Sequence, residues 1–118
     1  MVIRFDRENA PGERAESHYS GFVLPSCAAL SELMALLPER CDLLKARGTV
    51  WEIFARVGGG RLFYMSVDRE GSYSFGLLTD DAPARSVLPK GEIFGRLHCA
   101  EDFLLGDARY LEILKEIN

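Results

Sequence analysis

The segment from residue 49 to residue 78 constrains the fold most, because two turn sequences divide it into three apolar stretches. The sequence DREGS at 68–72 suits a type I turn with Gly71 in the left-handed region, followed by a bulge that sets Asp68 opposite Ser72. A slip of one residue would mix apolar side chains with serines, so the turn and the hydrophobic pattern agree. The predicted register gathers these residues on one face: Phe63, Met65, Val67, Tyr73, Phe75 and Leu77.

Residues 49–57 carry both a capping-box pattern with helical spacing and a strand-like alternation. The glycine run at 58–60 can close a second hairpin that pairs Val57 with Arg61. That register adds Trp51, Ile53 and Ala55 to the same apolar face. Because two independent turns indicate one face, we predict an antiparallel meander with strands at about 50–57, 61–67 and 72–78.

Apolar residues recur at helical spacing on both sides of the meander. Ser26 is a good N-cap and Pro38 predicts a kink or a new start, so residues 26–47 are expected to form a helical pair that ends at Gly48. Residues 100–117 are expected to form a C-terminal helix. A further strand is predicted at 92–98, and residues 19–24 and 85–88 are candidates for another short strand. The expected fold class is α+β: the meander plus one or two further strands, packed with the helical pair and the C-terminal helix.

The chain of 118 residues is expected to form a single domain, 1–118, in which residues 6–18 are a polar loop or mobile arm. Its formal net charge of −4 argues against nucleic acid as a partner. No apolar run reaches the roughly 20 residues of a membrane span, and the N-terminus lacks the apolar stretch of a secretory signal. Three cysteines without paired spacing favour a reducing compartment, so we predict a cytoplasmic protein.

The sequence contains a glycine run, cysteines, histidines and paired acids, but not with the spacing of a known phosphate-binding, catalytic or metal site. The glycines at 58–60 do not open a helix, so they are interpreted as a hairpin loop rather than a phosphate loop. Cys99 adjoins His98, but neighbours on a strand point to opposite faces, and no spacing links His18 to either residue. The acids at 80–81 suit a turn. We therefore expect no cofactor, no metal and no catalytic residue, and a binding role is favoured over an enzyme.

The outer face of the meander combines an aromatic centre with a polar rim, as many protein interfaces do. The predicted register sets these pairs opposite each other: Phe54 with Tyr64, Tyr64 with Gly76, and Leu62 with Leu78. The predicted partner-binding residues are Phe54, Tyr64, Leu62, Leu78, Glu52 and Arg56. Two other interpretations stay open: a helix of the same chain covers this face, or the aromatic residues shield Gly76 across the strands.

In length, acidity and element order, the chain resembles small bacterial toxin-immunity domains. The likeness rests on the segment 38–48, the meander and the helix containing Phe103 and Leu104, and it transfers no functional residues. It implies an acidic protein-binding module that occludes a toxin or effector. In such a module Phe54 and Tyr64 are expected to anchor in a pocket, while Glu52 and the acids at 68–70 and 80–81 steer a basic partner. The alternatives are a small enzyme or ligand-binding domain with a cleft between sheet and helices, and a homodimer that pairs through the outer face.

Overall fold

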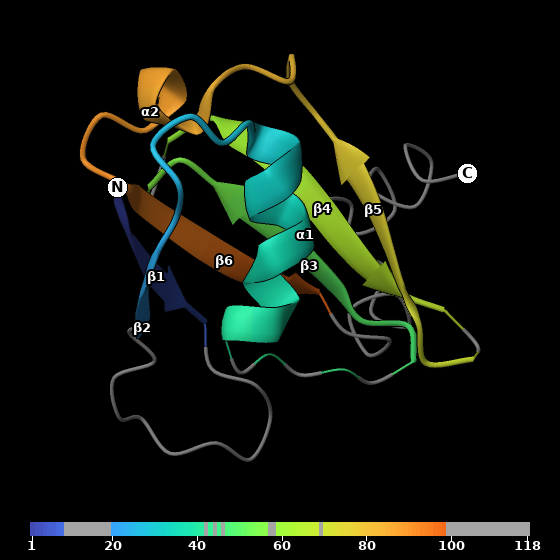
Figure 1. Ribbon diagram of the computed structural model, residues 1–118. Helices are drawn as coiled ribbons and strands as arrows, with labels where there is room; N and C mark the ends of the chain where they lie inside the picture. Colours follow the sequence, from blue (N-terminus) through green and yellow to red (C-terminus); the bar gives the residue numbers. More distant parts are fainter. Residues whose placement is uncertain are drawn as a thin grey trace.

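A single curled sheet with a helix across one face organises the molecule (Figure 1). The computed structural model describes residues 1–8, 20–41, 43, 45, 47–56, 59–68 and 70–98. Within them the sheet order is β2-β1-β6-β3-β4-β5, and neighbours are antiparallel except for the parallel pair β1 and β6. The strands are β1 (Val2–Arg7), β2 (Ser20–Val23), β3 (Val50–Phe54), β4 (Arg61–Val67), β5 (Tyr73–Leu77) and β6 (Glu92–His98). The helices are α1 (Leu30–Arg40) and α2 (Ala84–Val87).

The hairpin between β4 and β5 confirms the register predicted from its turn. Gly71 has φ of 80°, and the Asp68 N–H donates to the Ser72 carbonyl at 3.0 Å. The Asp68 carboxylate closes the turn further by accepting the N–H groups of Glu70 and Ser72, each at 2.9 Å. Met65 consequently pairs with Phe75, as the turn requires.

The hairpin between β3 and β4 has the predicted faces but a different register. β3 ends at Phe54, and Ile53 pairs with Phe63, two residues away from the predicted partner Met65. The reason lies in the loop, where the Ala55 N–H donates to the Gly60 carbonyl at 2.9 Å and Arg61 pairs with Phe54. Because side chains alternate with a period of two, this shift leaves the inward residues inward.

The predicted helical pair at 26–47 is wrong in the part that the structure describes. α1 begins at Leu30 instead of after Ser26, and it continues through Pro38 to Arg40. The proline removes one hydrogen-bond donor close to the end of the helix, where the interruption is tolerated. Residues 42, 44 and 46 and the predicted helix at 100–117 lie outside the described residues.

The start of α1 is fixed by the loop that follows β5. The Leu30 N–H donates to the Ala82 carbonyl at 3.0 Å, and the Ser31 N–H donates to Asp81 Oδ1 at 2.9 Å. These bonds satisfy N–H groups that have no partner within a helix. A cap supplied from 50 residues away leaves no local signal in the sequence.

The short strands were predicted with mixed success. β6 confirms the strand predicted at 92–98 and β2 the candidate at 19–24, whereas residues 84–87 form helix α2 where 85–88 was a candidate strand. Ala84 and Leu88 are both buried and four residues apart, which is helical spacing. β1 runs to Arg7, so the polar segment predicted to begin at residue 6 starts later, and residues 9–19 lie outside the described residues.

The core lies between α1 and the inner face of the sheet. Fully buried side chains meet there from the helix and from strands β1, β3 and β4: Leu30, Leu33, Leu37, Ile3, Phe5, Trp51, Ile53, Phe63 and Met65. Gly95 in β6 leaves room for the Phe5 ring, since a Cβ at this position would lie 2.9 Å from Phe5 Cζ. No helix among the described residues has the length and apolar character needed to span a bilayer.

Candidate functional site

The predicted interface on the outer face is only partly accessible. Leu62 and Glu52 are buried, at 3% and 0% exposure. Of the other predicted residues, Phe54, Tyr64 and Leu78 are half-buried and Arg56 is exposed. A partner therefore cannot reach two of the six residues in this structure.

The pairing around Tyr64 explains why its ring packs on the sheet. Tyr64 stands opposite Gly76, as predicted, but its other neighbour is Glu52, and Phe54 pairs with Arg61. The predicted Phe54–Tyr64 pair is wrong for this reason. A Cβ at Gly76 would overlap the Tyr64 ring, so the glycine provides the space in which the ring lies.

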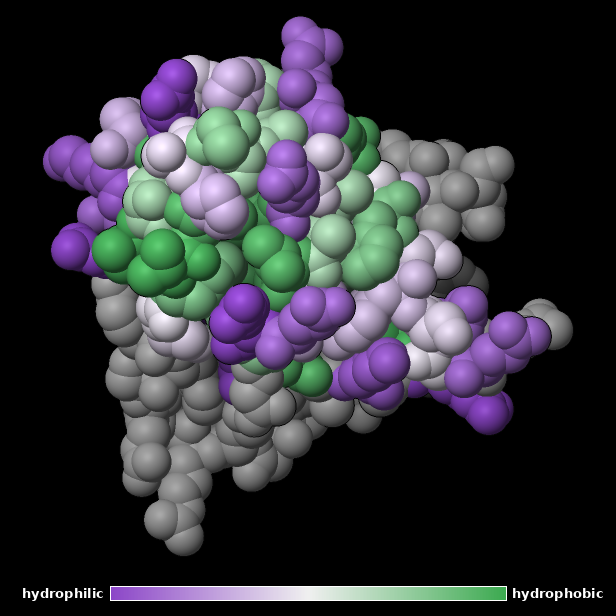
Figure 2. Space-filling model, viewed as in Figure 1, coloured by the Kyte–Doolittle hydropathy of each residue, from purple (hydrophilic) through white to green (hydrophobic). Residues whose placement is uncertain are grey.

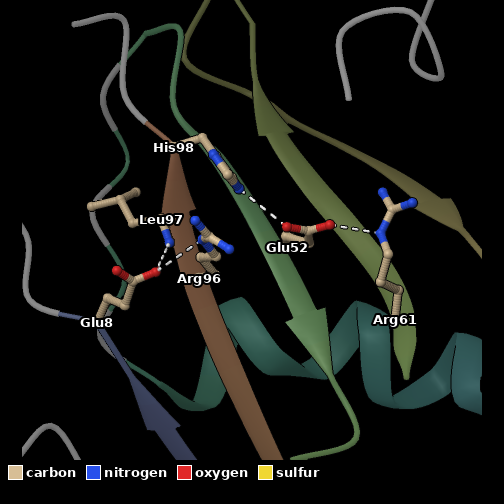
Figure 3. A network of polar contacts seen from close by, with 6 residues as sticks. All are labelled: Glu8, Glu52, Arg61, Arg96, Leu97 and His98. Carbon is tan, nitrogen blue, oxygen red and sulfur yellow. Dashed lines mark hydrogen bonds and ion pairs between the residues drawn. The ribbon is translucent and has the colours of Figure 1, made fainter. Parts of the chain in front are cut away.

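Glu52 is the centre of a buried polar network that sequence patterns missed (Figure 3). Its Oε1 lies 3.1 Å from His98 Nε2, and its Oε2 lies 2.6 Å from Arg61 Nε. Removing a carboxylate from water is costly unless charged or hydrogen-bonding groups replace the solvent. Here an imidazole and a guanidinium replace it, and the network connects β6, β3 and β4.

A β-bulge brings Arg61 to this network. Ile53 pairs with Phe63, but the next residue, Phe54, pairs with Arg61, so the ladder skips Leu62. A bulge of this kind redirects the following side chain, which here reaches Glu52. A smaller contact ties the end of β1 to β6 in the same region: Glu8 Oε1 accepts the Leu97 N–H at 3.3 Å and lies 3.7 Å from Arg96 Nε (Figure 3).

The chemistry available to this network is limited by its burial. A histidine beside a carboxylate can act in acid–base catalysis when the ring reaches a substrate. His98 is 2% exposed and its Nε2 faces Glu52, so the pair acts as a link between strands. Within the described ranges, no group of three or more His, Cys, Asp or Glu side chains is arranged to hold a metal ion.

The two described cysteines differ in accessibility. Cys27 is exposed, whereas Cys41 is buried. Burial raises the pKa of the Cys41 thiol, and a hydrogen bond with Ser20 and the charge of Arg7 oppose that shift more weakly. A thiol with a raised pKa is a poor nucleophile. Cys99 and His18 lie outside the described residues.

The surface around β5 presents apolar groups to solvent. Phe75 is 38% exposed, and its ring centroid lies 6.0 Å from that of Tyr73. The Lys45 ammonium lies 5.0 Å from the centre of the Tyr73 ring, which is a cation–π distance. On the face that carries α1 and β5, apolar side chains extend from the side of β1 and β2 across α1, and paler apolar ones lie on the side of β5 (Figure 2).

Acidic residues lie at both ends of β5. Asp68 and Glu70 precede the strand, Asp80 and Asp81 follow it, and all four are exposed. Hydrogen bonds from the Ser31 hydroxyl and the Ser31 N–H lower the pKa of the Asp81 carboxyl below its usual value. Residues Tyr73 and Phe75, together with these four acids, are called the β5 surface below.

The sequence predicted the face of Phe75 correctly but not its exposure. Phe75 follows the alternation that also directs Phe63 and Met65 towards the core. β5 is the outer strand of the described sheet, however, and β6 joins the meander at β3 instead. The only local signal was that Phe75 lies between Ser74 and Gly76 and that acids flank the strand.

Comparisons with protein-family models, curated proteins and solved structures find no match for this chain. Its function is therefore inferred from the geometry of its own residues.

Proposed function

We propose that this protein is a protein-binding module that inhibits a basic partner, as an immunity protein does, and that the β5 surface makes the contact. The exposure of Phe75 between two acidic segments is the observation that supports this proposal. This surface replaces the outer-face site predicted around Phe54 and Tyr64, where Glu52 and Leu62 are buried.

An aromatic residue held on a strand is a suitable anchor. Phe75 has two side-chain torsions to fix, so burying its exposed part in a partner loses little entropy. Interfaces draw most of their binding energy from a few such anchors in water-excluded pockets. The neighbouring Tyr73 ring supports Phe75 from one side.

The acids of the β5 surface favour a partner with basic side chains. Two of the four carboxylates precede the strand that carries the anchor and two follow it, and the Lys45 ammonium lies over the neighbouring Tyr73 ring. Such an arrangement accelerates association with a positively charged surface and makes the association rate fall as salt rises. The overall charge of −4 acts in the same direction.

Photo-crosslinking in the native host tests the proposal. A benzophenone amino acid replaces Phe75 in one variant and Val23 in a control, because Val23 is 73% exposed on β2, the opposite outer strand. We expect position 75 to give one dominant adduct with a basic protein, and position 23 to lack it. The same adducts from both positions, or no discrete adduct from position 75, would contradict the proposal.

Inhibition is tested with the crosslinked protein. If that partner arrests growth when it is expressed alone, co-expression of the wild-type chain is expected to restore growth. Phe75→Ala is expected to weaken the rescue, and Val23→Ala is expected to preserve it. Circular dichroism establishes that both variants fold. Full rescue by Phe75→Ala would remove this surface from the mechanism.

A further inference from the structure

A recess lies at the end of the sheet where the β3–β4 loop approaches the turn before β6. Its volume is about 340 Å³, within the usual range of small-molecule sites. Figure 1 shows this end of the sheet beside α2, away from β5. The residues that line it include Ala55, Arg56, Val87, Leu88, Pro89 and Lys90. None of them belongs to the β5 surface.

The walls of the recess are hydrogen-bonded turns. On one side, Ala55 N–H donates to the Gly60 carbonyl at 2.9 Å, and Gly59 N–H donates to the Arg56 carbonyl at 2.8 Å. On the other side, Gly91 N–H donates to the Leu88 carbonyl at 3.0 Å. Gly91 has φ of 67°, and a Cβ there would overlap the Val2 carbonyl, so this turn requires glycine. The turn from Leu88 to Gly91, fixed in this way, loses little entropy when a ligand binds.

The recess combines an apolar interior with cations at its rim. Leu88 is buried and Val87 is half-buried, whereas Arg56 and Lys90 are exposed. The carboxylate of Glu92 also lines the recess. In the backbone register of β1 and β6, Glu92 stands opposite Arg4. A second recess shares Lys90 and Glu92 and extends to Arg4. Three cations and one carboxylate make this end of the molecule locally positive, although the chain as a whole is acidic.

We propose that this recess binds a small amphipathic anion. An apolar body would pack against Val87, Leu88 and Ala55, and a carboxylate or phosphate would lie between Arg56 and Lys90. A cation at the edge of an apolar pocket favours a ligand of this shape over a neutral analogue, because the charge of the ligand stays at the solvated rim. The inference is independent of the protein-binding proposal, since the two sites share no residue.

Amide NMR titration of the full chain tests this site with matched probes. Octanoate and octyl phosphate supply the two anions, and octanol supplies the same apolar body without charge. We expect an anion to saturate the protein at millimolar concentration and to shift the amides of Gly59, Gly60 and Lys90 first. Octanol is expected to bind at least about 5-fold more weakly. Comparison of octanoate with octyl phosphate identifies the preferred headgroup.

Variants separate this site from general attraction to the protein. Arg56→Gln and Lys90→Gln are each expected to weaken anion binding about 2- to 5-fold, and the double variant about 10-fold. Arg40→Gln, an exposed cation at the end of α1, serves as the control and is expected to bind as the wild type does. Three outcomes would each overturn the proposal: no saturation by either anion, equal affinity for octanol, or equal weakening by Arg40→Gln. Phe75→Ala is expected to leave anion binding unchanged, which keeps the two proposals distinguishable.

Discussion

Apolar side chains are expected to be buried and charged ones exposed, and the centre of the sheet and its β5 edge each hold one exception. Glu52, in the central strand β3, is charged and fully buried, while Phe75, in the outer strand β5, is apolar and 38% exposed. Both residues point to the face that the alternation predicts. The difference teaches that alternation decides the face of a side chain, whereas the position of its strand in the sheet decides its depth.

The largest expected effect is at the centre, from Glu52→Ala. This change removes the buried carboxylate that pairs with Arg61 and lies against His98, and loss of one partner from a buried ion pair costs about 3–5 kcal/mol of unfolding free energy. Urea unfolding measures it. Glu70→Ala, at an exposed position beside β5, is the control and is expected to change stability by less than about 0.5 kcal/mol. Similar losses for the two variants would break the contrast between centre and edge.

Two phenylalanines on the same face measure depth directly. Phe63 in β4 is fully buried and Phe75 in the adjacent β5 is not. Phe63→Ala is expected to lose about 3–5 kcal/mol, and Phe75→Ala less than about half of that, because less apolar surface and a smaller cavity are involved. Denaturant unfolding of both variants gives the ratio. Equal losses would mean that Phe75 is a core residue in solution.

A smaller loss of stability is expected from Gly76→Ala, in β5, where the strand pairs with Tyr64 of β4. The added methyl group overlaps the Tyr64 ring, which must move, at a cost of about 1–3 kcal/mol. Gly60→Ala, where a Cβ meets no atom within 4 Å, is expected to cost less than about 1 kcal/mol. In a Tyr64→Ala background the cost of Gly76→Ala should largely disappear, which a double-mutant cycle detects. If Gly76→Ala costs as much in that background, the Tyr64 ring is not the group that the added methyl group overlaps.

The smallest expected effect is the pH dependence contributed by Asp81. Because hydrogen bonds from Ser31 lower its pKa in the folded state, ionised Asp81 stabilises the fold above its unfolded pKa of about 4. That contribution is lost as the pH falls through the lower folded value. Urea midpoints measured from pH 7 to pH 2 should therefore show Asp81→Asn converging on the wild type under acid. Ser31→Ala, which keeps the backbone bond, is expected to have part of the same effect.

Much of the central sheet could be predicted because the determinants are local. The turn at 68–72 contains its own carboxylate acceptor and its left-handed glycine, so the β4–β5 register followed from five residues. For β3 and β4 only the faces were predictable, because a bulge that skips Leu62 changes the register without changing the alternation.

The remaining features depend on residues far apart in the chain. The start of α1 depends on Asp81 and Ala82, and the burial of Glu52 depends on His98. The exposure of Phe75 depends on β6 joining the sheet at β3. No pattern within one segment encodes such contacts, so the burial of Glu52 and Leu62, two of the six predicted partner-binding residues, could not be predicted.

The parallel pairing of β1 with β6 has a consequence for synthesis on the ribosome. Arg4 leaves the exit tunnel long before its partner Glu92, because the two residues lie far apart in the chain. Until then Ile3 and Phe5 lack the strand beside which they are buried, so the nascent chain exposes apolar groups that chaperones bind. Chains that stall before residue 92 should therefore be recognised as unfolded, however long they wait.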